Sequence, residues 1–182
     1  MSKTEDNLKA AFAGESQARN KYSYFASTAR KEGYHYIAKL FEETAANERE
    51  HAEQELKLLK GIGSTMENLK AAAEGENDEH TSMYPEFARI AEEEGNKEAA
   101  NLFRMIAKVE KEHEARYRKL LELVGKGGVF KREKPIRWRC SQCGFVYEGT
   151  EPPEKCPCCH HAREYYEPEC MCMREGCESC GL

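Results

Sequence analysis

The chain has 182 residues, of which 40% are hydrophobic by a broad count and 34% are charged, with a net charge of -5. This length suffices for one substantial core plus a small second domain, and the acidic balance without clustered basic residues disfavours a nucleic-acid partner. The sequence shows neither an export signal nor an apolar run of membrane-spanning length, so we expect a cytoplasmic, soluble protein with no membrane partner.

Apolar residues recur every three to four positions from residue 5 to about residue 124, which is the period of an amphipathic α-helix. The pattern breaks at residues 32–33, 60–63 and 94–95, where glycine interrupts it, and so divides into four helical segments. We therefore predict a mainly α fold, with a four-helix bundle over residues 1–128.

The four segments repeat in pairs. Residues 14–33 resemble residues 75–95, and residues 40–51 resemble residues 102–113, which indicates a duplicated two-helix unit. The second copy is one residue longer before Phe87, where it carries Tyr84 and Pro85. We expect Pro85 to start, bend or locally loosen a helix, because proline lacks a backbone N–H.

Acidic and imidazole side chains interrupt the apolar stripes of these segments. In the fourth segment, Glu110 and His113 follow Ile106 at helical spacing. An isolated buried carboxylate costs several kcal/mol, so an inward Glu-x-x-His pair implies a bound metal, unless that face is solvated. Taken together, the four stripes bring the following side chains toward one layer: Glu15, Glu48, His51, Glu76, Glu79, Glu110 and His113.

One Glu from each of two helices, with a Glu-x-x-His pair from each of two others, is the ligand arrangement of di-iron and di-manganese ferritin-like bundles. Carboxylates bridge and neutralise two cations, and neutral imidazole suits iron. Glu79 exceeds the minimal ligand set, and we expect it to replace His51 on an oxidised ion. A solvated face explains a single motif well, but two motifs related by duplication favour the metal site.

Tyr22 and Tyr84 follow Glu15 and Glu76 by seven and eight positions, about two helical turns. Their hydroxyls are candidates to donate hydrogen bonds to a metal-bound carboxylate, and ordinary core packing fits their positions equally well. The histidines outside the stripes are expected to be surface residues, namely His35, His80, His160 and His161.

All nine cysteines follow residue 139. Two Cys-x-x-Cys pairs, Cys140 with Cys143 and Cys156 with Cys159, predict a tetrahedral four-thiolate site. We assign this site to a small domain over residues 138–168, which follows a linker over residues 129–137 and needs its metal to fold. Spacing alone does not separate iron from structural zinc, and Cys158 can only replace a neighbouring ligand.

The remaining cysteines lie in a tail over residues 169–182, at Cys170, Cys172, Cys177 and Cys180. Either a disordered end or a second four-thiolate site fits this tail. The odd number and close spacing of the cysteines favour metal-binding thiolates over a disulfide framework, and therefore a reducing compartment.

Several stretches together resemble the rubrerythrin family, and the resemblance covers nearly everything to Tyr166. They are GESQARNKY (14–22), ETAANEREHA (43–52), MYPEFARIAEEEG (83–95), VEKEH (109–113) and residues 130–159. The resemblance implies a homodimer with a ferritin-like bundle and a rubredoxin-like domain. It also implies a non-haem di-iron centre held by the seven stripe residues and a single iron held by Cys140, Cys143, Cys156 and Cys159. A rubredoxin second knuckle usually ends Cys-Gly, whereas here Cys158 precedes Cys159 and His160 follows it.

The activity implied by this resemblance is reduction of hydrogen peroxide to water, a protection against oxidative stress, with Glu79, Tyr22 and Tyr84 as catalytic candidates. Electrons would return singly through the four-cysteine iron. Because the sequence has no glycine-rich dinucleotide fingerprint, NAD(P)H is expected to act through a separate reductase or a rubredoxin. Glu110 lies roughly 20 Å before the end of its helix, so the Cys domain of a partner subunit is the expected donor.

Two other functions stay open on the sequence. One is a ferritin-like ferroxidase that stores iron, which shares the bundle site but has no need for a thiolate-bound relay. The other is a non-enzymatic zinc-ribbon module on a helical scaffold.

Overall fold

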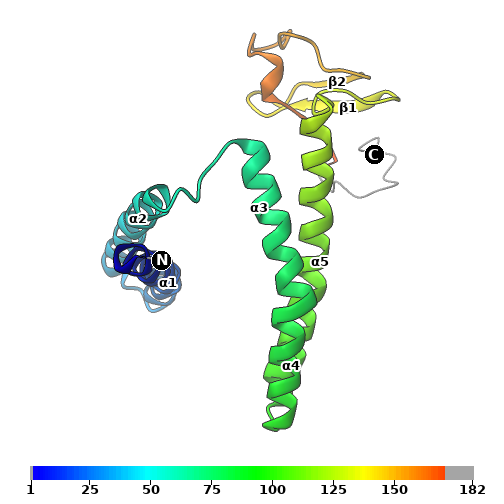
Figure 1. The fold of residues 1–182 in the computed structure, drawn as a ribbon. Coiled ribbons are helices and arrows are strands. Elements are labelled where there is room, and N and C mark those ends of the chain that lie inside the picture. Colours follow the sequence, from blue (N-terminus) through cyan, green and yellow to red (C-terminus); the bar gives the residue numbers. More distant parts are fainter. Residues whose placement is uncertain (1, 171–182) are drawn as a thin grey trace. The chain divides into compact units, whose positions relative to one another are not determined.

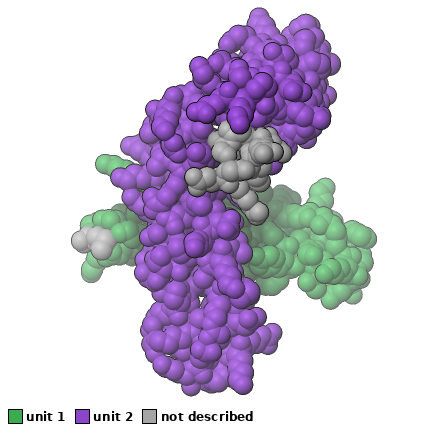
Figure 2. Space-filling model, turned by 90° about the vertical axis from the view of Figure 1, so that its right-hand side faces the viewer, with its two compact units in different colours: residues 1–63 green, residues 64–182 purple. Residues whose placement is uncertain are grey.

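The computed structural model describes residues 2–170 and is mainly helical, with a small antiparallel sheet near the end of the chain (Figure 1). The chain forms two compact units, residues 1–63 and residues 64–182 (Figure 2). Of the tail cysteines, only Cys170 belongs to the described residues, and Cys172, Cys177 and Cys180 lie outside them. Within residues 2–170, no helix combines the length and apolar character that a bilayer crossing requires.

The first unit is a helical hairpin of α1 (Lys3–Lys31) and α2 (His35–Leu58). The Ser2 hydroxyl caps α1 by accepting a hydrogen bond from the Glu5 N–H at 3.2 Å. The helix ends at Lys31, and Gly33 reverses the chain just beyond it with a φ of +85°, which is accessible to glycine at little cost. Small residues such as Ala26 and Ala38 are buried between the helices, which lets the two backbones approach closely.

The second unit begins with a helical segment in three parts: α3 (Thr65–Asp78), a π-helical turn η1 (Glu79–Met83) and α4 (Tyr84–Glu93). This segment packs along α5 (Lys97–Gly125). Ser64 and Glu67 form a reciprocal capping box at the start of α3. The predicted helical segments and their breaks are therefore confirmed, with the third segment interrupted by a wider turn.

The π turn lies where the second repeat is one residue longer than the first. At its end the Tyr84 N–H donates to the Glu79 carbonyl, five residues back instead of four. Pro85, which has no N–H to donate, follows at the start of α4. The expectation that Pro85 starts or loosens a helix is confirmed.

Matching aromatic clusters confirm the internal duplication. Ring centroids of Tyr22, Phe25 and Phe41 lie 5.7 to 6.2 Å apart in the first hairpin. The equivalent rings in the second unit, which belong to Tyr84, Phe87 and Phe103, lie 5.6 to 6.3 Å apart. The extra residue in the second repeat therefore leaves the aromatic packing beyond it unchanged.

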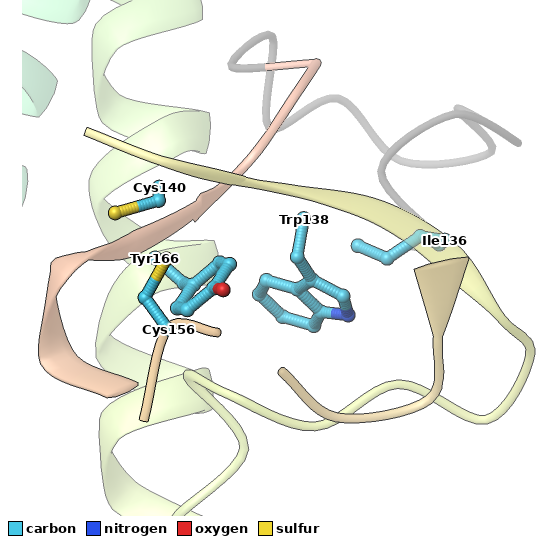
Figure 3. Close-up of a cluster of buried hydrophobic side chains, with 5 residues drawn as sticks. All are labelled: Ile136, Trp138, Cys140, Cys156 and Tyr166. Atoms are coloured by element: carbon cyan, nitrogen blue, oxygen red, sulfur yellow. The ribbon is translucent and has the colours of Figure 1, made fainter. Parts of the chain in front are cut away.

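The sheet consists of β1 (Ile136–Cys140), β2 (Val146–Gly149) and β3 (Tyr166–Pro168) in the order β2-β1-β3, with both pairs antiparallel. Alternate residues of β1 point inward, so Ile136, Trp138 and Cys140 are buried. They pack with Cys156 and Tyr166, and Figure 3 shows the two cysteines beside Tyr166 at one end of this cluster and Ile136 at the other. Two of these five core residues are thiols, so the domain has little apolar core of its own.

Arg132 attaches the linker (residues 129–137) to the sheet domain. Its side chain is 5% exposed, its guanidinium donates to the Gly128 carbonyl at 2.9 Å, and it lies 5.2 Å from the centre of the Trp138 ring. The Arg132 N–H also donates to the Thr150 carbonyl at 2.8 Å. These contacts fix the linker against both the turn that follows α5 and the sheet domain.

Candidate metal sites

The first hairpin brings Glu15 of α1 together with Glu48 and His51 of α2. One ligand atom from each residue lies within 4.8 Å of the other two. His51 Nδ1 is 2.8 Å from a Glu48 oxygen and 4.0 Å from a Glu15 oxygen. Two carboxylates and an imidazole thus converge on one small volume, as the stripe pattern predicts.

The second unit repeats this arrangement with Glu76 of α3 and with Glu110 and His113 of α5. Their ligand atoms again lie within 4.8 Å of one another. His113 Nδ1 is 2.6 Å from a Glu110 oxygen and 3.7 Å from a Glu76 oxygen. The Glu110 and Glu76 side chains are only 14% and 20% exposed, so this trio is the more enclosed of the two.

The electrostatics of both trios suit a cation. Burial, followed by a shared hydrogen bond and repulsion from Glu48, raises the pKa of Glu15. Burial and Glu110 raise the pKa of Glu76 in the same way. Carboxylates held this close repel each other when ionised, and a divalent ion relieves that repulsion while imidazole supplies a further ligand. The donor set therefore fits iron.

Two of the catalytic candidates, Glu79 and Tyr84, interact electrostatically with the second trio. Glu79 is partly buried on the π turn, outside the close group of the second trio, and its charge still acts on Glu76. Burial and then the charge of Glu79 raise the pKa of Tyr84, which keeps that hydroxyl protonated and able to donate. Tyr22 occupies the equivalent position in the first aromatic cluster.

The two Cys-x-x-Cys pairs converge as predicted from their spacing. The Sγ atoms of Cys140 and Cys159 are 3.7 Å apart and those of Cys143 and Cys156 are 3.6 Å apart. A tetrahedral ion at about 2.3 Å from each sulfur would separate the sulfurs by about 3.8 Å. Burial opposes ionisation of Cys156, but the Tyr166 hydroxyl and two backbone N–H groups outweigh it and lower the pKa to about 6. The sulfur positions thus fit one four-coordinate metal.

The two cysteine-bearing turns have the same backbone geometry despite their different sequences. In the first, the Gly144 N–H donates to the Cys140 carbonyl at 2.8 Å, with φ at +78°. In the second, the His160 N–H donates to the Cys156 carbonyl at 2.9 Å, with φ at +61°. His160 therefore adopts a left-handed conformation that glycine accepts more readily.

The expectation that all the other histidines are surface residues is wrong for His80. Its side chain is 14% exposed, and its Nε2 lies 2.6 Å from an oxygen of Glu114. His80 lies four residues after Glu76 and therefore on the same side of the helical segment, which faces Glu114 of α5. His35, His160 and His161 are exposed, although His161 Nδ1 approaches the Cys159 Sγ to 3.3 Å.

Two family models match this chain, one over its helical part and one over its sheet domain. The family model described as rubrerythrin matches residues 6–121, and the one described as the rubredoxin-like domain of rubrerythrin matches residues 138–167. The chain belongs to the rubrerythrin family. Rubrerythrins are oxidoreductases that combine a di-iron centre with a rubredoxin-like four-cysteine centre, and the trios and the thiolate group supply donors for both.

Curated rubrerythrins match the chain over nearly its whole length. The rubrerythrin of Porphyromonas gingivalis is 53% identical, covering 92% of this chain and 90% of its own. The putative rubrerythrin of Methanocaldococcus jannaschii is 50% identical, covering 93% and 94%. The rubrerythrin of Clostridium perfringens is 48% identical, covering 91% and 93%. The family thus accounts for both the helical part and the sheet domain.

Proposed function

We propose that this chain is a non-haem di-iron peroxidase that reduces hydrogen peroxide to water and protects against oxidative stress. The observation that carries the proposal is the presence, in one rubrerythrin chain, of two carboxylate–histidine trios and a four-thiolate group with tetrahedral spacing. A ferroxidase or a zinc-ribbon module has no need for all three groups together.

The ligands of the proposed di-iron centre are the two trios and the additional carboxylate of the π turn, namely Glu15, Glu48, His51, Glu76, Glu79, Glu110 and His113. Iron held there supplies the two electrons that the oxygen–oxygen bond of peroxide accepts as it breaks. The balance is one peroxide, two electrons and two protons for two water molecules. Glu79 and the hydroxyls of Tyr22 and Tyr84 are proposed to orient the substrate and to deliver those protons.

The four cysteines Cys140, Cys143, Cys156 and Cys159 are proposed to hold a single iron that passes electrons one at a time. NAD(P)H is the proposed source, acting through a separate reductase or a rubredoxin. The proposed assembly is a homodimer, and the proposed compartment is the reducing cytoplasm. None of Cys140, Cys143, Cys156, Cys158 and Cys159 forms a disulfide, which supports that compartment.

The test is anaerobic loading of the purified protein with ferrous salt, followed by addition of peroxide. We expect three iron atoms per chain, and one peroxide consumed per di-iron centre without release of dioxygen. Glu110→Ala should abolish this reaction, whereas Cys140→Ala should leave the first turnover intact and block re-reduction. Iron uptake far beyond three atoms per chain would instead indicate storage, and peroxide consumption that survives Glu110→Ala would refute the proposal.

A further inference from the structure

Glu114 lies at the centre of a partly buried polar cluster in the second unit, and the proposed chemistry does not use it. It follows His113 on α5, and its side chain is 13% exposed. One of its oxygens accepts a hydrogen bond from the Asn77 amide at 3.0 Å, and the other accepts one from His80 Nε2 at 2.6 Å. Arg118 donates to it from the next turn at 2.6 Å.

These bonds link two helical segments across the helix interface. Asn77 lies near the end of α3 and His80 lies on the π turn, so both approach the same carboxylate of α5 from the facing segment. The Glu114 carboxylate is 13% exposed and has three partners within 3.0 Å, one of them the Arg118 guanidinium. Bonds between a carboxylate and a charged donor are roughly twice as strong as neutral ones.

The first repeat lacks the cluster and lacks the π turn as well. Ala52 follows His51 where Glu114 follows His113. At the positions of Asn77 and Glu79, counted from the first glutamate of each repeat, α1 carries Ser16 and Ala18. The equivalent stretch of α1 is an uninterrupted α-helix. The inserted residue, the extra carboxylate and the cluster thus occur together in one repeat.

A π turn needs support from its surroundings, because its wider hydrogen bonds are less favourable than those of an α-helix. Inside the turn, the Thr81 hydroxyl donates to the Asn77 carbonyl at 2.6 Å, which supplies a donor to a carbonyl at the point of interruption. Pro85 closes the far end. The bond from His80 to Glu114 ties the turn to α5, and His80 is the residue directly after Glu79.

We propose that Glu114, with Asn77 and His80, is a positioning cluster that holds the π turn and thereby directs Glu79 toward Glu76 and Glu110. None of the three cluster residues is a proposed ligand. The cluster instead fixes the backbone from which the additional carboxylate extends. The inference that the cluster directs Glu79 toward a metal site rests on the proposed function. The inference that the cluster holds the π turn does not.

The first test measures the backbone in metal-free, full-length protein by hydrogen–deuterium exchange with mass spectrometry. Glu114→Ala introduces the residue that the first repeat carries at this position, and Glu114→Gln removes only the charge. Glu122→Ala is the matched control, because it removes exposed ion pairs with Lys119 and Lys126 from the same helix. We expect exchange over residues 79–84 to accelerate at least tenfold in Glu114→Ala, less in Glu114→Gln, and not in the control.

The second test asks whether the cluster acts through Glu79. Anaerobic Co²⁺ titration, followed by visible absorption, would be compared among wild type, Glu114→Ala, Glu79→Gln and the double variant. We expect Glu114→Ala to weaken Co²⁺ binding about tenfold in the wild-type background and to have no further effect when Glu79 is already Gln. A purely structural role would weaken binding equally in both backgrounds.

The outcomes separate the cluster's role in holding the π turn from its role in directing Glu79. Unchanged exchange in both Glu114 variants would overturn the cluster's role in holding the turn. Accelerated exchange with an equal loss of Co²⁺ affinity in both backgrounds would overturn the link to Glu79. If wild-type protein binds no Co²⁺ at its carboxylate sites, the proposed function fails together with the cluster's role in directing Glu79, and exchange alone decides the role in the turn.

Discussion

Replacing Trp138 with phenylalanine should destabilise the sheet domain by a predictable amount. Trp138 is fully buried, its Nε1–H donates to the Gly149 carbonyl at 2.9 Å, and the Arg132 guanidinium lies over its ring. Phenylalanine keeps an aromatic ring but leaves the Gly149 carbonyl without this donor, at about 1–3 kcal/mol. The smaller ring also leaves a cavity and weakens the cation–π contact, at about 1 kcal/mol more. The expected loss is about 2–4 kcal/mol.

The assay is guanidinium unfolding of the iron-loaded protein, followed by the iron–thiolate absorption of the four-cysteine site. That signal reports the sheet domain alone, so the helical units do not mask the change. Tyr147→Phe is the matched control, because Tyr147 faces Trp138 in the β1–β2 register but is 39% exposed. We expect the control to stay within about 0.5 kcal/mol of wild type. If Trp138→Phe shifts the midpoint no further than Tyr147→Phe does, the assigned role of the indole is refuted.

Three further predictions follow from the geometry. His160→Gly should stabilise the sheet domain by about 1 kcal/mol in the same unfolding assay, because φ at His160 is +61°, and an unchanged midpoint would show that the turn carries no strain. Mixing Glu110→Ala chains with Cys140→Ala chains should restore steady-state peroxidase activity if electrons pass between subunits, and no recovery in the heterodimers would contradict that route. Deleting Ser82 gives the second repeat the seven-residue spacing between Glu76 and Tyr84 that the first repeat has between Glu15 and Tyr22. This deletion should convert the π turn to α-helix and weaken Co²⁺ binding about tenfold, and unaltered binding in a folded deletion variant would show that the turn does not serve the site.

Much of the fold and of the candidate sites could be predicted because their causes are local in the sequence. Helical periodicity and glycine breaks predicted the helical segments, and the repeated Glu-x-x-His pairs predicted the members of each trio. That all seven side chains share one layer stays a prediction. The cysteine spacing likewise predicted the thiolate group. Each of these features depends on spacing within one segment or on a duplicated pattern, which the sequence displays directly.

The cluster around Glu114 could not be predicted in this way, because it depends on contacts between segments. His80 lies outside the apolar stripe, and only its contact with Glu114 across the helix interface shows that it is largely buried. The available signal was the single extra residue before Phe87, combined with the replacement of Ala52 in the first repeat by Glu114 in the second. Only the three-dimensional path of the turn shows that these two differences meet.

The π turn also bears on how duplicated halves of a protein become different. A substitution changes one side chain in place, whereas an added residue would normally rotate everything beyond it by about 100° around the helix axis. Here the wide turn absorbs the added residue, since Tyr84 and Phe87 keep the same ring partners as their counterparts Tyr22 and Phe25. One copy can therefore acquire new chemistry through a change in chain length while its inherited packing persists, which gives a symmetric ancestor a simple route to an asymmetric descendant.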